Sequence, residues 1–219
     1  MGQHVGKADK LVALADLVEL ETGTLHEDRF TYENDLYVKA VQYKRLVRQQ
    51  RVCRSCPDMN IPSFTQGCAG WGNLNAKIFF VGQSLHEAGM LSALPFIKGS
   101  GYSIDAALFL SGLRRHDCFF SNVVHCHPQN NRPSTDEEKS NCRQFLLREL
   151  NLVQPKLIVA MGNDAKVASV EWVESFEAWE EKPPKIYRCK HPATFMYAAP
   201  EQRVDWIIKL SLRMDKVLG

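Results

Sequence analysis

The sequence has no long apolar run, no strong excess of one charge, and no repeated or low-complexity segment. No stretch approaches the about 18 consecutive apolar residues that predict a membrane-crossing helix. The first ten residues lack the apolar core of a secretory leader, so we expect a cytoplasmic protein with reduced cysteines. The net charge of +2 in 219 residues is too small to indicate a nucleic-acid partner by itself.

Cysteine is the informative residue type. Four of the seven cysteines form two spaced pairs, Cys53-x2-Cys56 and Cys126-x15-Cys142. Thiolates are soft metal ligands, so in a reducing compartment this pattern predicts a metal centre, either an iron–sulfur cluster or a four-cysteine zinc site. The other three are interpreted as ordinary buried thiols: Cys68, Cys118 and Cys189.

Predicted strands and helices alternate along most of the chain. Strands are expected at 77–81, 118–124, 156–161 and 185–189. Helices are expected at 9–21, 32–50, 103–113, 136–150, from 163 onwards, and at 201–218. This alternation predicts a three-layer α/β/α fold with a central, mostly parallel four-stranded sheet. The segment 53–76, rich in Gly, Pro, Asn and Ser, is expected to be a long irregular loop held by the metal.

Four loops are expected to leave the carboxyl ends of these strands, at 82–101, 125–134, 162–164 and 190–199. In open α/β sheets, ligands bind at that edge. Polar and aromatic residues in these loops are therefore the candidates for function.

Three motifs in these loops, together with the cysteine spacing, resemble the iron–sulfur (family 4-like) uracil-DNA glycosylases. Val81-Gly-Gln-Ser-Leu-His-Glu87, continued by Pro95-Phe96, resembles the first motif. The segment Asn122 to Pro133 resembles the second motif, and His191-Pro192-Ala193 the third. The chain is identified on these motifs as a divergent member, over about residues 44 to 215. We expect an N-terminal helical extension at 1–43 and a glycosylase-like domain at 44–219.

The resemblance implies a monofunctional DNA glycosylase that acts on a flipped pyrimidine and leaves an abasic site. It implies that Phe96 stacks on the extruded base, Asn122 bonds its Watson–Crick edge, and His191 donates to its O2. The backbone after Gly82 would help to close the pocket. The resemblance also implies a structural [4Fe–4S] cluster held by Cys53, Cys56, Cys126 and Cys142. DNA is the expected partner and a monomer the expected state.

Further residues of the same loops receive roles in this interpretation. Gln83 and Glu87 are the candidates for orienting the attacking water, with His86 third, and Ser84 and His86 would line the pocket. The residues expected to contact DNA are Arg132, Lys98, Phe195 and Met196. Phe195 or Met196 would wedge into the duplex, as apolar side chains do in other DNA-binding proteins.

The physical chemistry of base excision is consistent with these residue types. An enzyme that acts on a base must take it out of the stack, which costs a few kcal/mol. A stacking aromatic side chain offsets roughly 1–3 kcal/mol of that cost. An asparagine offers both a donor and an acceptor to a pyrimidine edge. Each residue taken alone has a structural interpretation, which weakens when all of them fall at one sheet edge.

Departures from the family pattern cluster in the first motif. Gln83 stands where the family has Glu, Leu85 where it has Pro, and His86 where it has Gly. An amide in place of a carboxylate removes a charge beside the base. We therefore hypothesise a bulkier, modified pyrimidine as substrate, such as those that members of this superfamily excise in antiphage defence, with uracil in DNA repair as the alternative.

Two other classes of function stay open. One is a catalytically inactive relative that binds DNA or a replication partner through the same cleft. The other is a redox-sensing iron–sulfur protein, in which a change in the cluster alters DNA affinity.

Overall fold

One five-stranded sheet forms the centre of the protein. The computed structural model describes residues 30–176 and 182–218, so the helix expected at 9–21 lies outside the described residues. The strands are β1 (Trp71–Gly72), β2 (Ile78–Ser84), β3 (Phe119–Val124), β4 (Leu157–Met161) and β5 (Lys185–Cys189). Their order across the sheet is β1-β3-β2-β4-β5. β2 to β5 are parallel, and only β1 is antiparallel to its neighbour.

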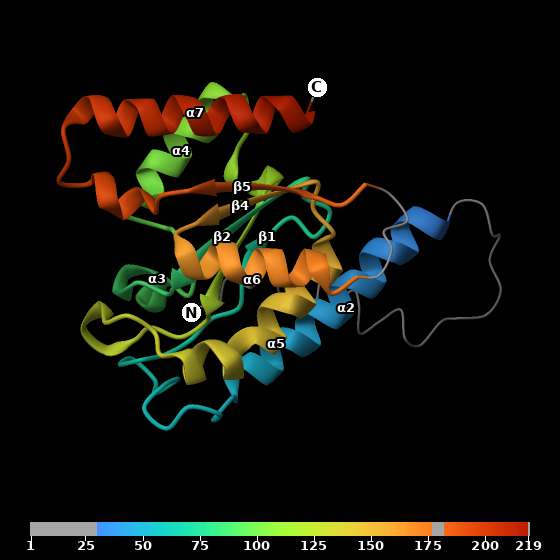
Figure 1. The fold of residues 1–219 in the computed structure, drawn as a ribbon. Coiled ribbons are helices and arrows are strands. Elements are labelled where there is room, and N and C mark those ends of the chain that lie inside the picture. Colours follow the sequence, from blue (N-terminus) through green and yellow to red (C-terminus); the bar gives the residue numbers. More distant parts are fainter. Residues whose placement is uncertain (1–29, 177–181, 219) are drawn as a thin grey trace, which may run out of the picture.

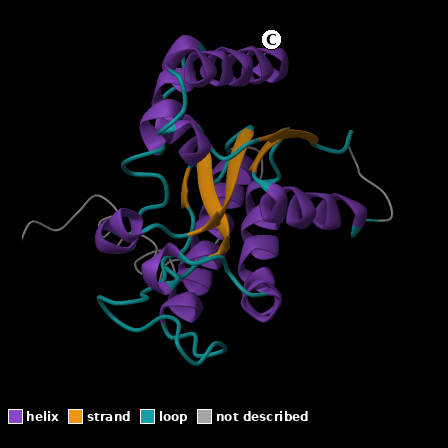
Figure 2. Ribbon diagram, turned by 60° about the vertical axis from the view of Figure 1, so that its left-hand side comes forward, coloured by secondary structure: helices purple, strands orange, loops and turns teal. Residues whose placement is uncertain are grey.

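Helices cover both faces of this sheet. The α-helices are α2 (Phe30–Arg51), α3 (Glu87–Ser92), α4 (Gly101–Leu110), α5 (Asp136–Val153), α6 (Asn163–Glu174) and α7 (Pro200–Leu218). Short 3-10 turns lie at Arg115–Asp117, Gln129–Asn131 and Pro192–Phe195. In Figure 1, α4 and α7 lie on one side of the sheet and α2, α5 and α6 on the other. Figure 2 shows the same three layers with the strands between the helices.

The side-chain alternation of a strand builds a separate core on each face. On β2, Phe79 and Val81 pack into the core that α5 and α6 cover, whereas Ile78 and Phe80 pack into the core beneath α4 and α7. Because helices cover both faces of β2, its side chains are apolar on both faces. The sequence of β2 is therefore a continuous apolar run instead of an alternating one.

The predicted fold class is confirmed, with a correction to the number of strands. The sheet has five strands rather than four, because Trp71–Gly72 adds a short antiparallel strand through the pairing of Trp71 with Phe120. Two residues in a Gly- and Asn-rich segment carry no periodic pattern, so this strand has no signal in the sequence. The short helix α3, inside the loop expected at 82–101, was also not predicted.

The first described helix joins the body of the protein. The phenol of Tyr43 donates a hydrogen bond to the carbonyl of Gly70, and its ring lies 6.1 Å from that of Phe119. The boundary expected between residues 43 and 44 falls inside α2, and the division into two parts stays a prediction. Over the described ranges, no helix is both long and apolar enough to cross a membrane.

The strand order creates a switch point at the carboxyl edge. β2 lies between β3 and β4, so the chain leaves β2 towards one side and later returns to its other side. Loops that leave the two sides of such a point diverge, which opens a crevice for ligands.

Candidate functional site

Gly82 is the point at which several predicted site residues meet. It pairs with Asn122 across β2 and β3. A Cβ atom at position 82 would lie 2.5 Å from Asn122 Oδ1 and 2.5 Å from Phe96 Cζ. Side chains never approach that closely, so Phe96 and Asn122 can both reach this place only because residue 82 has no side chain.

Phe96 is held over this glycine by an unusual backbone. Its φ is 60°, a left-handed value that non-glycine residues rarely adopt. The loop is fixed by the indole of Trp71, which donates to the Pro95 carbonyl at 3.0 Å. A phenylalanine held in this conformation beside a buried amide favours a functional position over a core position.

His191 approaches the same ring from the loop after β5. The centroids of the Phe96 and His191 rings are 6.1 Å apart. The Nδ1 atom of His191 accepts a hydrogen bond from the backbone N–H of Ala193 at 3.2 Å. In the neutral imidazole the proton is therefore on Nε2, which is free to donate. Burial, and then the charge of His86, lowers the pKa of His191 to about 4, so the neutral form prevails at neutral pH.

The structure thus brings together Gly82, Phe96, Asn122 and His191, which we call the edge group. The Asn122 side chain is only 4% exposed, so its amide sits in a water-poor place where a hydrogen bond to a ligand has full effect. His86 is exposed and caps the short helix α3, accepting from Ala88 N–H at 3.3 Å. The charge of His86 is, after burial, the second cause of the lowered pKa of His191. Ser84, half-buried, ends β2 two residues after Gly82.

The two residues predicted to orient water differ in their surroundings. Gln83 points away from Gly82, as strand alternation requires, and its Nε2 donates to Asp164 Oδ2 at 2.9 Å. Lys139 donates to the other oxygen of Asp164 at 3.2 Å. Glu87 is exposed in the first turn of α3. Asp164 was missed, although the loop 162–164 was expected at this edge and carries this single carboxylate.

The residues predicted to contact DNA differ in their exposure and in the contacts of their side chains. Arg132 makes a bidentate pair with Glu138, at 3.0 and 2.5 Å. Lys98 is exposed. Phe195 packs against Trp206, with ring centroids 6.3 Å apart, and belongs to the core beneath α7. Met196 is 47% exposed, and its neighbour Tyr197, which the sequence analysis did not name, is 96% exposed.

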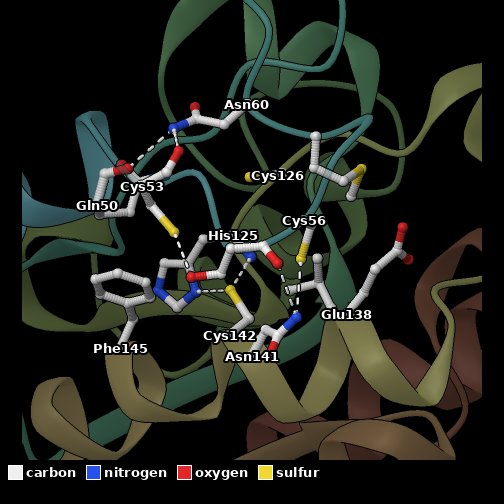
Figure 3. Close-up of a pocket in the computed structure, with 13 residues that line it drawn as sticks. Gln50, Cys53, Cys56, Asn60, His125, Cys126, Glu138, Asn141, Cys142 and Phe145 are labelled. Atoms are coloured by element: carbon white, nitrogen blue, oxygen red, sulfur yellow. Dashed lines mark hydrogen bonds between the residues drawn. The ribbon is translucent and has the colours of Figure 1, made fainter.

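The four paired cysteines line one cavity, drawn in Figure 3. Cys53 and Cys56 come from the loop after α2, Cys126 from the loop after β3, and Cys142 from α5. In residues 30–176 and 182–218, no three His, Cys, Asp or Glu side chains converge as ligands of one metal ion would. The four thiols are spread around the cavity, as the ligands of the expected iron–sulfur cluster would be.

Other atoms around the cavity fit such a cluster. The buried Nε2 of Gln50 lines the cavity and has no hydrogen-bond partner among the residues that the structure describes. An N–H aimed at a cluster sulfur would satisfy it. A Cβ at position 67 would lie 2.8 Å from Cys126 Sγ, so Gly67 leaves room for that sulfur. Burial raises the pKa of Cys126, and the neighbouring cysteines raise it further, so this thiol needs a nearby cation to become a thiolate.

Asn60 fixes the cysteine loop and was not predicted. Its Nδ2 lies 3.1, 3.2 and 3.0 Å from the carbonyls of Gln50, Arg51 and Cys53, and its Oδ1 accepts from Gly67 N–H at 3.0 Å. One side chain therefore closes the end of α2 and orders the loop that follows. The three remaining cysteines behave as expected only in part, since Cys118 is buried and Cys68 and Cys189 are half-buried.

The edge group defines a class of protein. A planar ring placed there would meet an aromatic face, an amide with a donor and an acceptor, and an N–H donor suited to developing negative charge. These groups are the ones expected in an enzyme that binds a heterocycle and stabilises it as an anion.

Comparison with known proteins specifies the class. The family model described as Uracil DNA glycosylase superfamily matches residues 69–211, and the chain belongs to that superfamily. The chain is 31% identical over 175 residues to a type-4 uracil-DNA glycosylase of Archaeoglobus fulgidus, covering 74% of this chain and 86% of that one. It is 34% identical over 130 residues to a type-4 uracil-DNA glycosylase of Thermotoga maritima, covering 59% and 67%. The expectation of a monofunctional DNA glycosylase is confirmed by these relationships.

Proposed function

We propose that the protein hydrolyses the N-glycosidic bond of a pyrimidine extruded from DNA and leaves an abasic site. The observation that carries this proposal is the convergence of Phe96, Asn122 and His191 around Gly82. The names of the relatives, which are uracil-DNA glycosylases, support it. Activity as a cytoplasmic monomer remains our expectation.

The edge group supports a simple mechanism. The extruded base stacks on Phe96, and the Asn122 amide bonds its Watson–Crick edge. As the bond between C1′ and N1 breaks, its electron pair moves onto the base, and His191 donates from Nε2 to O2, where negative charge develops. The oxygen of a water molecule then bonds to C1′, and its proton leaves to solvent while the base anion takes up a proton. One such positioned donor contributes about 3–4 kcal/mol to transition-state stabilisation.

Gln83 and Glu87 remain the candidates for orienting that water. Gln83 donates through Nε2 to Asp164, which leaves its carbonyl oxygen as an acceptor. An amide oxygen can orient a water molecule without removing its proton, which suits a reaction in which the sugar already carries positive charge.

The paired cysteines are proposed to hold a structural [4Fe–4S] cluster. When bound, the cluster supplies a rigid cross-link between the loops after α2 and β3 and the helix α5. Leu85 N–H donates to the Cys126 carbonyl at 3.4 Å, so the cysteine loop also supports the loop that follows Gly82.

The base is proposed to be a C5-modified pyrimidine, of the kind that hypermodified phage DNA contains. The support is the set of changes in the first motif, at Gln83 in β2 and at Leu85 and His86 directly after that strand. Uracil is the second candidate, favoured by the names of the relatives.

Matched oligonucleotides test both candidates. They carry uracil, 5-hydroxymethyluracil, 5-hydroxymethylcytosine or its glucosylated form, and alkali cleaves the strand wherever a base was removed. We expect breaks at a modified pyrimidine with higher kcat/KM than at uracil. Release of uracil with equal or greater efficiency would reject the modified substrate and leave a uracil-DNA glycosylase.

A His191→Ala variant separates an enzyme from a binding module. For an enzyme, we expect turnover to fall by about 10²–10³-fold while DNA affinity stays unchanged. No strand breaks on any substrate with the unaltered protein would indicate the inactive module. A DNA affinity that follows the oxidation state of the cluster would indicate the redox sensor.

A further inference from the structure

A buried histidine–glutamate pair lies directly behind Cys142. His125 is 1% exposed and Glu149 is fully buried, and His125 Nε2 lies 3.1 Å from Glu149 Oε1. Neither side chain has a role in the excision mechanism. Burying two ionisable groups away from water costs free energy. We therefore expect His125 and Glu149 to have a neighbouring partner with which they interact.

Cys142 is that partner. The backbone N–H of His125 donates to Cys142 Sγ at 3.2 Å, and the ring Nδ1 lies 3.5 Å from the same sulfur. Figure 3 shows the His125 ring between Phe145 and the Cys142 sulfur, at the wall of the cysteine cavity. A metal-bound cysteine sulfur carries no proton and can only accept, so Nδ1 is the donor in this contact when Cys142 is a ligand.

Glu149 is itself held on two sides. Its Oε1 accepts from Gly70 N–H at 2.7 Å, and its Oε2 accepts from the Ser121 hydroxyl. A Cβ at position 70 would lie 2.9 Å from Glu149 Oε2, so residue 70 must be glycine for the carboxylate to fit. Ser121 precedes Asn122 on β3, with its side chain on the opposite face, so the same contacts fix the strand that carries the base-reading amide.

We propose that His125, oriented by Glu149, is a positioning residue for the iron–sulfur cluster, donating hydrogen bonds to the thiolate of Cys142. The proposal rests on the cluster assigned under the proposed function. Hydrogen bonds to cluster sulfurs withdraw negative charge, which favours the reduced state and strengthens retention of the metal. The Glu149–His125–Cys142 contacts have the same form as the carboxylate–histidine pairs that orient ligands at other metal sites.

Cluster properties measured without DNA test this proposal. The protein is purified without oxygen, and its iron and sulfide content, its rate of iron loss to a chelator and its reduction potential are determined. His125→Leu removes both ring nitrogens and keeps the backbone N–H. His125→Asn restores a donor near the position of Nδ1. Leu146→Ala, at a buried neighbour on α5, serves as the control for general loss of stability.

We expect His125→Leu to lose iron about 10–100-fold faster than the unaltered protein and to have a lower reduction potential. His125→Asn should recover most of both losses, and Leu146→Ala should lower the melting temperature without changing the potential. Glu149→Gln, which keeps an acceptor but not the charge, should fall between the unaltered protein and His125→Leu, and it tests the proposal if His125→Leu does not fold.

Three results would overturn the proposal. In the first, His125→Leu has the reduction potential and rate of iron loss of the unaltered protein, or differs from it no more than Leu146→Ala does. In the second, His125→Asn shows the same changed potential and iron loss as His125→Leu. In the third, the unaltered protein holds zinc or no iron. Because no substrate enters these measurements, failure of the excision proposal would leave their outcome unaffected.

Discussion

His191 shows how one residue's surroundings set its chemistry. Its Nδ1 is occupied by the Ala193 N–H, and its pKa is lowered to about 4, by burial first and then by the charge of His86. The group is therefore a neutral donor through Nε2. A neutral donor loses no proton to solvent near pH 7 and is matched to an anion that forms only in the transition state.

The first prediction concerns pH. Because the folded pKa of His191 lies near 4, kcat/KM should show no inflection near 6.5 from this residue, and an acid limb should appear only as the pH approaches 4. Rapid assays between about pH 4 and 8 check this. An acid limb centred near pH 6.5 that disappears in His191→Gln would contradict it.

The same shift has a defined sign for stability. Between pH 4 and 6.5 the unfolded chain binds a proton at residue 191 that the folded chain does not, so this residue makes folding less favourable as the pH falls through that window. Above pH 6.5 it contributes nothing.

The second prediction concerns Met196 and Tyr197. Both side chains are exposed beside the edge group's His191 loop, whereas Phe195 is packed against Trp206. If they wedge into the duplex, the double variant Met196→Ala and Tyr197→Ala should lose activity about 10-fold or more on double-stranded DNA, since unstacking costs a few kcal/mol. Activity on single-stranded DNA should be unchanged. Equal losses on both substrates would contradict the wedge.

At the scale of elements, the sequence predicted the helices and strands that carry a periodic or capping pattern. It missed very short elements, and residues whose role depends on contacts with distant segments. β5 lies where predicted and α5 begins there, because Thr135 and Glu138 form a capping box that the sequence displays. The edge group follows from motifs at strand ends. Asp164, Asn60 and the His125–Glu149 pair could not be predicted, because each acquires its role from a contact with a distant segment.

The third prediction joins β2, α6 and α5. A glutamate at position 83 would face Asp164 at the 2.9 Å now bridged by an amide N–H, and two carboxylates there repel each other. We expect Gln83→Glu to lower both the melting temperature and kcat. Asp164→Asn should cost less alone and should restore the Gln83→Glu variant, because an amide then faces a carboxylate again.

A double-mutant cycle measures this coupling. Single losses that simply add in the double variant would show that Gln83 and Asp164 act independently. Lys139→Met is a useful comparison, because it removes the cation on Asp164 at 3.2 Å and leaves Gln83 in place.

At the scale of the molecule, hydrogen bonds between two loops connect the cysteine cavity to the edge group. Cys126 follows β3, the strand that carries Asn122, and its carbonyl accepts from Leu85 N–H, three residues after Gly82. His127 Nδ1 lies 2.9 Å from the Leu85 carbonyl. The loop after Gly82 therefore rests on the loop that would hold the cluster.

The fourth prediction follows from that support. Cys56→Ser should prevent cluster assembly, lower the melting temperature and reduce kcat/KM even at temperatures where the variant stays folded, because the Leu85 loop loses its anchor. Cys68→Ser is the matched control. Cys68 is half-buried, and its N–H donates to the carbonyl of His125, next to Cys126, but it lies outside the two cysteine pairs. The Cys68→Ser variant should therefore keep its iron and its activity. Circular dichroism, iron content and single-turnover excision are measured on both proteins. If Cys56→Ser lacked iron yet excised the base at the normal rate while folded, the cluster would serve stability alone, and the physical link through Leu85 would carry no function.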